Sequence, residues 1–420
     1  MATGNIEAVL PLTPAQEGIL FHTLLAPESP LYFQQYTCVL NGPLDPDDLR
    51  AAWDLVVERH PALRSLIAWE GRDQPLQVVR ERVRSEWLVE DLRGVDEAEA
   101  EATVEAFLDH DRSRGFVGDD RHHFVWSHHH IVVDGWSMGI VLDEVFEAHA
   151  AIVAGETPEL PPPPDHRTYL RWLQTRDRSR DEAHWRETLE GFSMPTALGI
   201  ENRGTSESPW AERHAEQSVR LSPDTTERLV GFARSNGLTL GTVLTGAWAL
   251  VLSRHGISDD VVFGTTVSGR PPEVDGVLGM VGLFINTLPV RVLVDPAASL
   301  VDWLSDIQSR QVATGPFEST PLVDVQAWSE VPAGEPLFRS LLVLENVPHP
   351  SEGHGPLRVS QVRYLQRSNY PLALLVMPGD SLEVVVLHDA DRFSPDAIGR
   401  LADHFTTVLA SIADDAPTRV

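Results

Sequence analysis

The sequence is poor in cysteine, in cationic residues and in long apolar runs. Cys38 is the only cysteine among 420 residues, which excludes an internal disulfide framework and a zinc site built from four cysteines. Only 33 lysine and arginine residues stand against 62 aspartate and glutamate residues, and the net charge of −29 disfavours nucleic acid and anionic membranes as partners. No apolar run reaches the length of a membrane span, and no basic segment followed by an apolar run stands at the N-terminus. We therefore predict a cytoplasmic protein without a signal peptide.

The residues that are present indicate a large α/β protein. A chain of 420 residues is longer than one hydrophobic core normally covers, and helical and strand-like patterns alternate along it. Four consecutive prolines, Pro161 to Pro164, continue neither a helix nor a central strand. We therefore predict two lobes of α/β (α+β) class, one over residues 1–164 and the other over residues 165–420.

Local signals predict several individual elements. Thr13, Pro14 and Gln16 form the pattern of a helix start with a capping box. We expect a strand over residues 32–40, a helix over residues 46–60 and a further helix over residues 169–189. The pattern Trp-x-Leu-Val-x-x-Arg-His occurs at residues 53–60 and again at residues 248–255, which fits two lobes built on one plan.

A histidine-rich segment carries the candidate chemistry. The apolar residues of this segment predict a buried strand as far as Val133, and its alternation places His128, His130 and Asp134 on one face and His129 on the other. Imidazoles and a carboxylate are costly to bury without a purpose. The ordinary pKa of histidine, about 6.5, suits proton transfer at neutral pH. Beyond Asp134 the strand is expected to stop.

The order of residues in this segment resembles a known family. His129-His130-x-x-x-Asp134-Gly135 resembles the His-His-x-x-x-Asp-Gly motif of the condensation domains of nonribosomal peptide synthetases and of related chloramphenicol acetyltransferase-like enzymes. Further segments resemble condensation-domain motifs in order along the whole chain, which is harder to match by accident than one motif. They are LTPAQEGILFH at 12–22, RHPALR at 59–64, FGTTVSGR at 263–270, MVGLFINT at 280–287 and LLVLEN at 341–346.

The resemblance implies a fold, an activity and a set of partners. It implies two chloramphenicol acetyltransferase-like lobes in a V-shaped pseudo-dimer with a central tunnel. It also implies an acyltransferase that forms a peptide bond between a donor thioester and an acceptor amine, in antibiotic or siderophore biosynthesis. Donor and acceptor peptidyl carrier domains would deliver the substrates on phosphopantetheine arms. Adenylation domains and an upstream epimerisation domain are the expected neighbours, and no cofactor of its own is expected.

The same resemblance implies roles for individual residues. His130 would orient or deprotonate the attacking amine, and the backbone N–H of Gly135 would donate to the oxyanion of the tetrahedral intermediate. His129 would be structural, and Asp134 would pair with Arg270 across the lobes. The residues expected to line the tunnel are Trp136, Ser137, Asn286 and Asn346. Apart from any family, Ser137 is also expected to cap the helix that follows Asp134.

Two comparisons with the family refine this interpretation. Residues 16–22, residues 280–286 and the pair Asn369-Tyr370 resemble the subtype that follows an epimerisation domain and accepts a D-configured donor. In the family, a strand with a Pro-Leu-x-Arg-like core separates the Arg-Gly-Phe segment from the histidine strand. Here Phe116 leads almost at once to the histidine strand through Val117. Either a true deletion lies beside the active site, which puts activity in doubt, or loop residues are missing from the sequence.

Three other interpretations compete with condensation. An epimerisation domain has the same scaffold and histidine motif, but it needs a general base that removes an α-proton. A non-catalytic recruiting module on the same scaffold tends to lose the second histidine or the glycine of the motif, and both are present here. A zinc site is disfavoured because alternate strand residues diverge. Its ligands would come from His122, His123, His128, His129 and His130.

Overall fold

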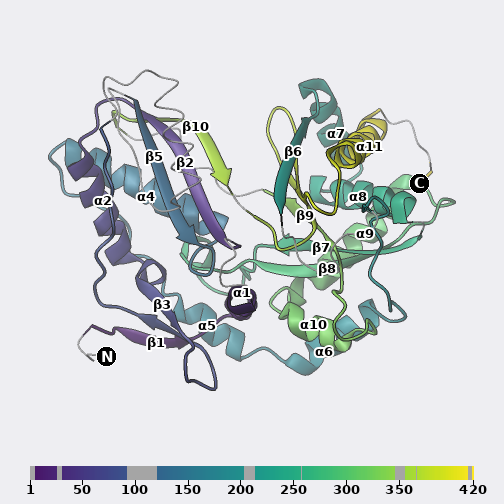
Figure 1. Cartoon of the computed structure of the whole chain (residues 1–420), viewed down its shortest axis with the longest axis horizontal. Helices are drawn as coiled ribbons and strands as arrows, with labels where there is room; N and C mark the ends of the chain where they lie inside the picture. Colours follow the sequence, from purple (N-terminus) through teal and green to yellow (C-terminus); the bar gives the residue numbers. More distant parts are fainter. Residues whose placement is uncertain are drawn as a thin grey trace. The chain divides into compact units, whose positions relative to one another are not determined.

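The structure, a computed structural model, divides the chain into two compact units (Figure 1). Unit 1 comprises Met1–Arg176, Arg270–Phe284 and Val347–Arg367, and unit 2 comprises Asp177–Gly269, Ile285–Asn346 and Ser368–Val420. The first boundary therefore falls after Arg176 rather than after Pro164. Two later segments return to unit 1, which a single boundary cannot represent. The residues that the structure describes are 5–25, 31–91, 121–202, 213–256, 258–345, 355–365, 367–414 and 419–420.

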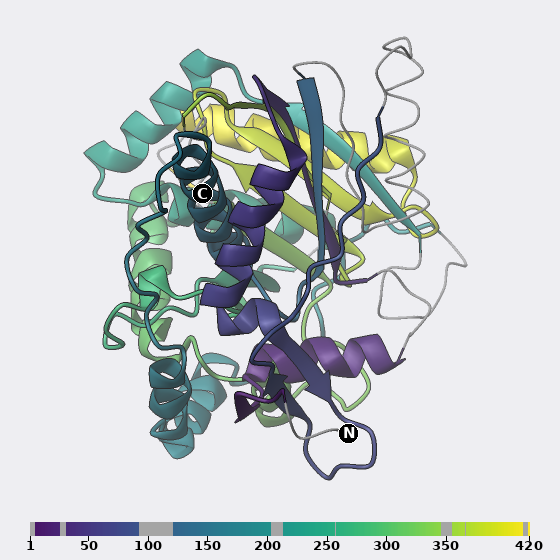
Figure 2. The ribbon, with the colours of Figure 1, turned by 90° about the vertical axis from the view of Figure 1, so that its left-hand side faces the viewer.

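Over its described residues, unit 1 contains two three-stranded antiparallel sheets. The smaller sheet has the order β1 (Ala8–Pro11), β4 (Leu76–Val79), β3 (Ser65–Ala68). The larger has the order β10 (Arg358–Leu365), β2 (Phe33–Asn41), β5 (Arg121–His129), and Figure 2 shows β2 and β5 running side by side. The helices are α1 (Pro14–Leu25), α2 (Pro46–Arg59), α4 (Gly135–Val153) and α5 (Arg167–Gln174), with the short 3-10 helices η1 (Pro61–Arg64) and η2 (Val277–Gly279).

The core of unit 1 forms where α2 and α4 pack together with the larger sheet. Alternate residues of β2, including Tyr36 and Leu40, point into this core and are almost fully buried. Trp53 of α2 packs edge-on against Trp126 of β5, with ring centroids 5.0 Å apart. Phe146 of α4 belongs to the same cluster. The inward-pointing residues of β2 and the apolar face of α2 therefore meet in one apolar layer.

The start of α1 confirms the predicted capping box. The Thr13 N–H donates to Oε1 of Gln16 at 2.9 Å, and the Gln16 N–H donates to Oγ1 of Thr13 at 3.3 Å. The single helix predicted over residues 169–189 is wrong, because the chain forms α5 and then α6 (Arg178–Thr188). Asp177 begins the second helix by accepting a hydrogen bond from the Ser179 N–H at 3.0 Å. The boundary between the units passes through this break.

In the part of unit 2 that the structure describes, a six-stranded mixed sheet is covered by helices on both faces. Its strand order is β6 (His214–Arg220), β12 (Glu383–Asp389), β11 (Leu372–Met377), β9 (Ser340–Leu344), β7 (Asp260–Val267), β8 (Asn286–Leu293). The β11–β9 and β9–β7 pairs are parallel, and the other pairs are antiparallel. The helices are α6, α7 (Pro223–Ser235), α8 (Leu240–Gly256), α9 (Leu300–Thr314), η3 (Gly315–Phe317), α10 (Leu322–Trp328) and α11 (Pro395–Ala413).

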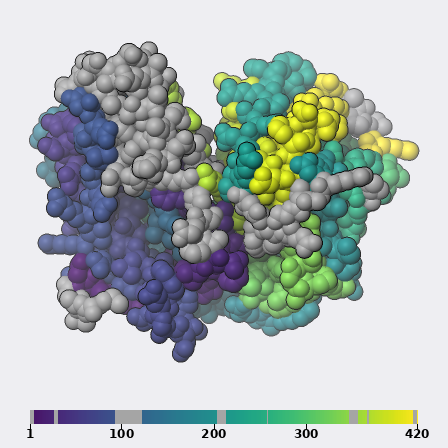
Figure 3. Space-filling model, viewed as in Figure 1, coloured from purple at the N-terminus to yellow at the C-terminus, as the bar shows by residue number. Residues whose placement is uncertain are grey.

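Residues of one strand divide between the two apolar layers of unit 2. Leu372 and Leu374 of β11 pack with α7, α8, α9 and α11, whereas Ala373 and Leu375 pack with α6 and α10. This even division explains why β11 reads as a continuous apolar run, since a strand covered on both faces has no solvent side. The outer face of α11 lies on the surface (Figure 3), where residues such as Asp403 are exposed.

In the described part of the chain, no single helix is both long and apolar enough to cross a membrane. Helices α7 and α8 meet the length and composition test only as a pair, across a bend of 107°. Their apolar side chains have a simpler explanation, because Leu229, Phe232 and Trp248 are buried in the core of unit 2.

Candidate active site

The chain turns sharply at His130. Strand β5 ends at His129 rather than continuing to Val133 as predicted. The His130 N–H still donates to the Tyr32 carbonyl at 2.7 Å, but the Val132 N–H turns back to the carbonyl of His129 at 3.2 Å. The β-branched residues after His130 favour a strand, yet hydrogen bonds between the histidine rings and the backbone hold them in a turn. His130 and Asp134 therefore do not share a strand face.

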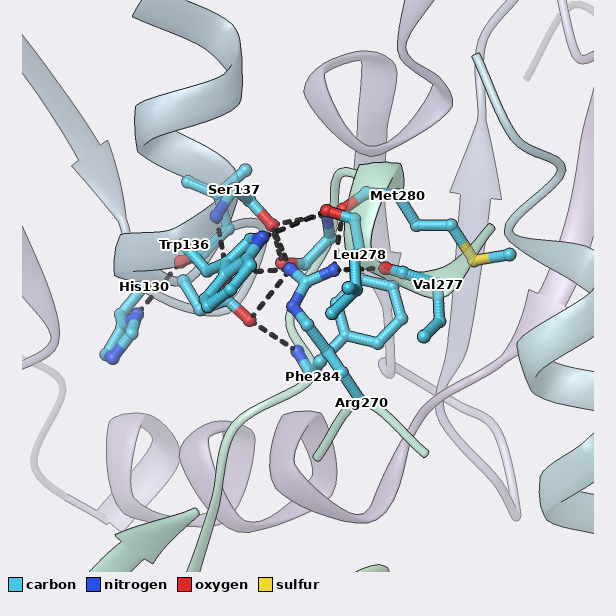
Figure 4. A network of polar contacts seen from close by, with 11 residues as sticks. His130, Trp136, Ser137, Arg270, Val277, Leu278, Met280 and Phe284 are labelled. Carbon is cyan, nitrogen blue, oxygen red and sulfur yellow. Dashed lines mark hydrogen bonds and ion pairs between the residues drawn. The ribbon is translucent and has the colours of Figure 1, made fainter. Parts of the chain in front are cut away.

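The hydrogen bonds of His130 fix its tautomer. Its Nδ1 lies 2.9 Å from the carbonyl oxygen of Val133, which accepts hydrogen bonds only, so Nδ1 carries the proton. The lone pair is then on Nε2. Burial lowers the pKa of His130, although the Val133 carbonyl and Asp134 oppose that shift. The ring points away from the Arg270 guanidinium (Figure 4). His130 is therefore a half-buried neutral imidazole with a basic nitrogen that is suited to accept a proton.

His129 has the opposite tautomer and a structural role. Its Nδ1 accepts a hydrogen bond from the Ile131 N–H at 3.2 Å, so the proton is on Nε2. Nε2 lies 3.5 Å from the hydroxyl of Thr23, which donates in turn to the carbonyl of Ile19 at 2.8 Å. Burial, with a smaller contribution from His130, lowers the pKa of His129 to about 4. His129 is thus neutral and ties the turn to α1.

His128 is a packed imidazole. The ring centroid lies 4.7 Å from that of Trp126. Within the described ranges, no hydrogen-bond partner reaches either ring nitrogen. Burial lowers its pKa to about 3, helped by the neighbouring His130 and His129. His128 therefore stays neutral in the folded protein at physiological pH.

Asp134 is the centre of a buried network that joins α4 to the segment from Arg270 to Phe284. Figure 4 shows its members Ser137, Arg270 and Phe284. The Nη2 of Arg270 donates to both carboxylate oxygens, at 3.2 and 3.4 Å, and both side chains are fully buried. The backbone N–H groups of Ser137 and Phe284 complete the carboxylate shell at 2.8 and 3.0 Å. The predicted pairing is present. It lies within unit 1, however, because Arg270 belongs to that unit, so it is not a pair across two lobes.

Arg270 also binds the chain around it. Its Nη1 donates to the carbonyls of Val277 and Met280 at 2.7 and 2.9 Å. The guanidinium lies 4.0 Å above the ring of Phe284. Burial lowers the pKa of Arg270, and the Asp134 carboxylate opposes that shift. One guanidinium thus fixes the path of the whole segment, which explains how a stretch from the middle of the sequence becomes part of unit 1.

Ser137 and Trp136 serve this network. The Ser137 hydroxyl donates to the Gly282 carbonyl at 2.8 Å and accepts from the Gly282 N–H and from Arg270, at 3.0 and 2.8 Å. With a fully buried side chain, Ser137 is a structural residue, and its predicted place as a tunnel-lining side chain is wrong. The indole N–H of Trp136 donates to the Leu278 carbonyl at 2.9 Å. Nothing in the sequence alone distinguished these contacts from substrate contacts.

Helix α4 begins three residues earlier than its predicted cap implies. Asp134, not Ser137, is the N-cap residue, because its carboxylate accepts from the Ser137 N–H. Gly135 is therefore the first helical residue. Among the described residues, no acceptor is found for the Gly135 N–H. A helix N-terminus presents free N–H groups and a partial positive charge, which suits an oxyanion.

The remaining predicted site residues lie elsewhere. Asn286 starts β8, and its amide donates to the carbonyls of Glu318 and Thr320 at 2.8 and 2.7 Å, so it satisfies backbone groups of unit 2. Asn346 and the junction of Phe116 with Val117 lie outside the described residues. Over the part of the chain that is described, no group of three or more His, Cys, Asp or Glu side chains is arranged to hold a metal ion.

Unit 1 also contains a mainly apolar cavity of about 330 Å³ away from this turn. Trp53, Trp87 and Trp126 line it together with other residues of α2 and β5. It includes none of the residues of the His130 turn or of the Arg270 network, so the candidate site is defined by the turn and not by this cavity.

Comparisons with known proteins identify the family. The model of the family described as condensation domain matches residues 6–420. A linear gramicidin synthase polypeptide of Brevibacillus parabrevis is 37% identical over 99% of this chain, and surfactin synthase subunit 3 of Bacillus subtilis (strain 168) is 30% identical over 96%. The chain spans 8% of the first relative's length and 32% of the second's.

Solved structures agree on the fold. The first condensation domain of the calcium-dependent antibiotic synthetase, in complex with a substrate analogue, has a TM-score of 0.82 at 20% identity and covers 99% of this chain and 98% of its own. The X-domain from teicoplanin biosynthesis has a TM-score of 0.82 at 22% identity, over 97% and 96% of the two chains. The match of the family model over nearly the whole chain decides the assignment: this chain belongs to the condensation-domain family.

Proposed function

We propose that this condensation domain joins a donor acyl or peptidyl thioester to an acceptor aminoacyl thioester, both carried on phosphopantetheine arms of carrier domains. The observation that carries the proposal is the tautomer of His130. Its Nδ1 is committed to the Val133 carbonyl, so the basic Nε2 is left for the acceptor amine. A neutral imidazole at physiological pH is what the attack of an amine on a thioester requires.

The reaction then needs only groups of this chain and the two substrates. The amine nitrogen attacks the thioester carbonyl carbon while Nε2 of His130 orients the amine or accepts its proton. The carbonyl oxygen becomes an oxyanion, for which the Gly135 N–H is the proposed donor. Collapse of the tetrahedral intermediate breaks the carbon–sulfur bond, and the released thiolate takes up a proton. The N–C bond formed is the new amide.

The proposed partners follow from this activity. They are a donor and an acceptor peptidyl carrier domain, with neighbouring adenylation domains and an epimerisation domain upstream, in the synthesis of an antibiotic or a siderophore. The phosphopantetheine belongs to the carrier domains, so this domain holds no cofactor of its own. Because residues 16–22, residues 280–286 and Asn369-Tyr370 resemble the D-donor subtype, we further propose a donor of D configuration.

The replacement of His130 tests the activity directly. His130→Ala is expected to lower the rate of amide formation between two loaded carrier proteins by about 10²–10⁴-fold, the usual contribution of a general base. His128→Phe is the matched control, because it removes a neighbouring imidazole that has no proposed part in the reaction. Condensation by His130→Ala at the rate of the control would refute the assignment. Donors of D and L configuration, compared in the same assay, test the subtype.

A recruiting module is the second candidate function, and one comparison favours it. A structure of the teicoplanin X-domain in complex with OxyB has a TM-score of 0.80 to this chain, so a protein of this fold is known in complex with another protein. The same assay separates the two candidates. A wild-type domain that binds a partner protein but forms no amide from loaded carriers would support the recruiting module. Exchange of the donor α-proton with deuterium from solvent, without amide formation, would instead indicate epimerisation.

A further inference from the structure

Gln16, in the first turn of α1, is placed to hold the turn that carries His130. Its side chain is 3% exposed. One amide hydrogen of Nε2 donates to the carbonyl of Ile131 at 3.1 Å, and the other donates to Oε1 of Gln77 at 3.3 Å. Its Oε1 accepts from the Thr13 N–H. Both N–H donors of the Gln16 amide and one acceptor site of its oxygen are therefore occupied, which fixes the orientation of the amide.

The contact with Gln77 continues into a partly buried chain of hydrogen bonds, called the relay below. Nε2 of Gln77 donates to the Ser65 hydroxyl at 2.8 Å, and that hydroxyl donates to the Pro61 carbonyl at 2.7 Å. The relay thus runs from the start of η1 through β3 and β4 to Gln16. It ends on the Ile131 carbonyl, directly after His130. Linked hydrogen bonds of this kind favour one geometry for their members.

The capping box alone does not explain why residue 16 is a glutamine. A glutamate at this position would accept the hydrogen bond from the Thr13 N–H equally well. A glutamate lacks the N–H donors of the Gln16 amide, which are bound to two oxygens, Oε1 of Gln77 and the carbonyl of Ile131. The Gln77 amide can turn over so that its N–H donates to the carboxylate. The Ser65 hydroxyl can then donate to the Gln77 oxygen. The carbonyl of Ile131 can only accept, so this contact alone has no substitute.

We infer that Gln16 is a positioning residue of the active site, which sets the place of His130 Nε2 through its hydrogen bond to the Ile131 carbonyl. The inference rests on the proposed role of His130 in amide formation. Gln16 acts through the turn and has no contact with substrate in this role. Loss of the bond lets the turn relax while His130 keeps its own bond to Val133, so chemistry is affected more than substrate binding. A displacement of about 1 Å at a reacting group lowers the rate about 10²-fold.

Two variants of Gln16 and one matched control test the inference. In Gln16→Glu, the ionised carboxylate faces the Ile131 oxygen, so we expect kcat about 10²-fold below wild type at pH 8 with the KM for the acceptor unchanged. The carboxylic acid can donate to that oxygen again, so the ratio of variant to wild-type kcat should rise as the pH falls toward 5.5. Gln16→Met has no titrating group and should lose kcat equally at both pH values.

Gln35→Glu is the control, because Gln35 is 4% exposed and its amide, as far as the described residues show, donates to the Ser127 hydroxyl, which can reverse. It should keep the wild-type kcat. If Gln16→Glu does not fold at pH 8, Gln16→Met and Gln35→Glu still decide the question through kcat. A Gln16→Met enzyme with the kcat of the control, or a Gln16→Glu ratio that is flat with pH, overturns the inference.

A spectroscopic measurement separates this inference from the proposed function. The imidazole nitrogen resonances of His130, assigned by their absence in His130→Ala, should shift in Gln16→Met and remain unchanged in Gln35→Glu. This result is independent of turnover. A wild-type domain that forms no amide would therefore refute the proposed function but would not contradict the positioning of His130 by Gln16. Unchanged His130 resonances in Gln16→Met would refute the positioning role even in an active domain.

Discussion

Removal of the Asp134 carboxylate should destabilise unit 1 far more than the loss of an ordinary helix cap. In Asp134→Ala, the buried Arg270 guanidinium loses its counter-ion, and the Ser137 and Phe284 N–H groups lose their acceptor. Breaking a buried ion pair on one side costs about 3–5 kcal/mol. For a unit of this size, each kcal/mol lowers the melting temperature by about 2–4 °C, so we expect a decrease of roughly 6–20 °C.

Asp45→Ala is the matched control. Asp45 caps α2 as Asp134 caps α4, accepting from the Asp47 N–H at 2.9 Å, but it is exposed. Its removal should cost about 1 kcal/mol, the usual value of a cap. The difference between the two variants therefore isolates the buried charge.

Calorimetry of three variants measures these quantities. The double variant Asp134→Ala/Arg270→Met removes both charges and should recover part of the stability that Asp134→Ala loses, because no unpaired charge is left in the interior. An Asp134→Ala protein with the same melting temperature as Asp45→Ala would refute the reasoning. So would a double variant that is no more stable than Asp134→Ala.

Three further predictions concern other parts of the molecule. Ser137→Ala removes three hydrogen bonds from the buried network and should cost about 1–3 kcal/mol in urea unfolding, so an unchanged midpoint would contradict its structural role. The unfolded chain protonates His128 below a pH of about 6.5, whereas the folded protein does so only near a pKa of about 3. Stability should therefore decrease as the pH falls through this window, by about 1.4 kcal/mol per pH unit for this proton, and His128→Phe should reduce the slope by that amount. Carrier proteins are usually acidic, as is this chain, so added salt should leave carrier affinity unchanged or improve it. A steep loss of affinity with salt in calorimetric titrations would instead indicate a dominant basic docking surface.

Signals that act over a few residues were predictable from the sequence. The capping box at Thr13 and Gln16 forms as its pattern indicates, because both partners lie within one turn. The strand predicted over residues 32–40 and the helix predicted over residues 46–60 likewise form, as β2 and α2. In each case the neighbours that decide the conformation are close along the chain.

Predictions failed where distant or competing contacts decide the conformation. The strand was expected to reach Val133 because valine and isoleucine favour strands, but the His129 and His130 rings bind the backbone of the turn. Ser137 was expected to cap α4, but its hydroxyl is taken by Gly282, 145 positions away. Both residue types can cap a helix, and only the tertiary partner decides which one does.

The hydrogen bond from the Phe284 N–H to the Asp134 carboxylate has a consequence for folding during synthesis. These two residues are 150 positions apart, so the ribosome must add that many residues after Asp134 before the carboxylate can find all its partners. At about 5–20 residues per second, this delay is roughly 8–30 s. During that time the nascent first segment holds an acidic side chain whose final surroundings do not yet exist. Unit 1 thus cannot mature in simple N-to-C order, and a fragment that ends before residue 270 should remain incompletely folded.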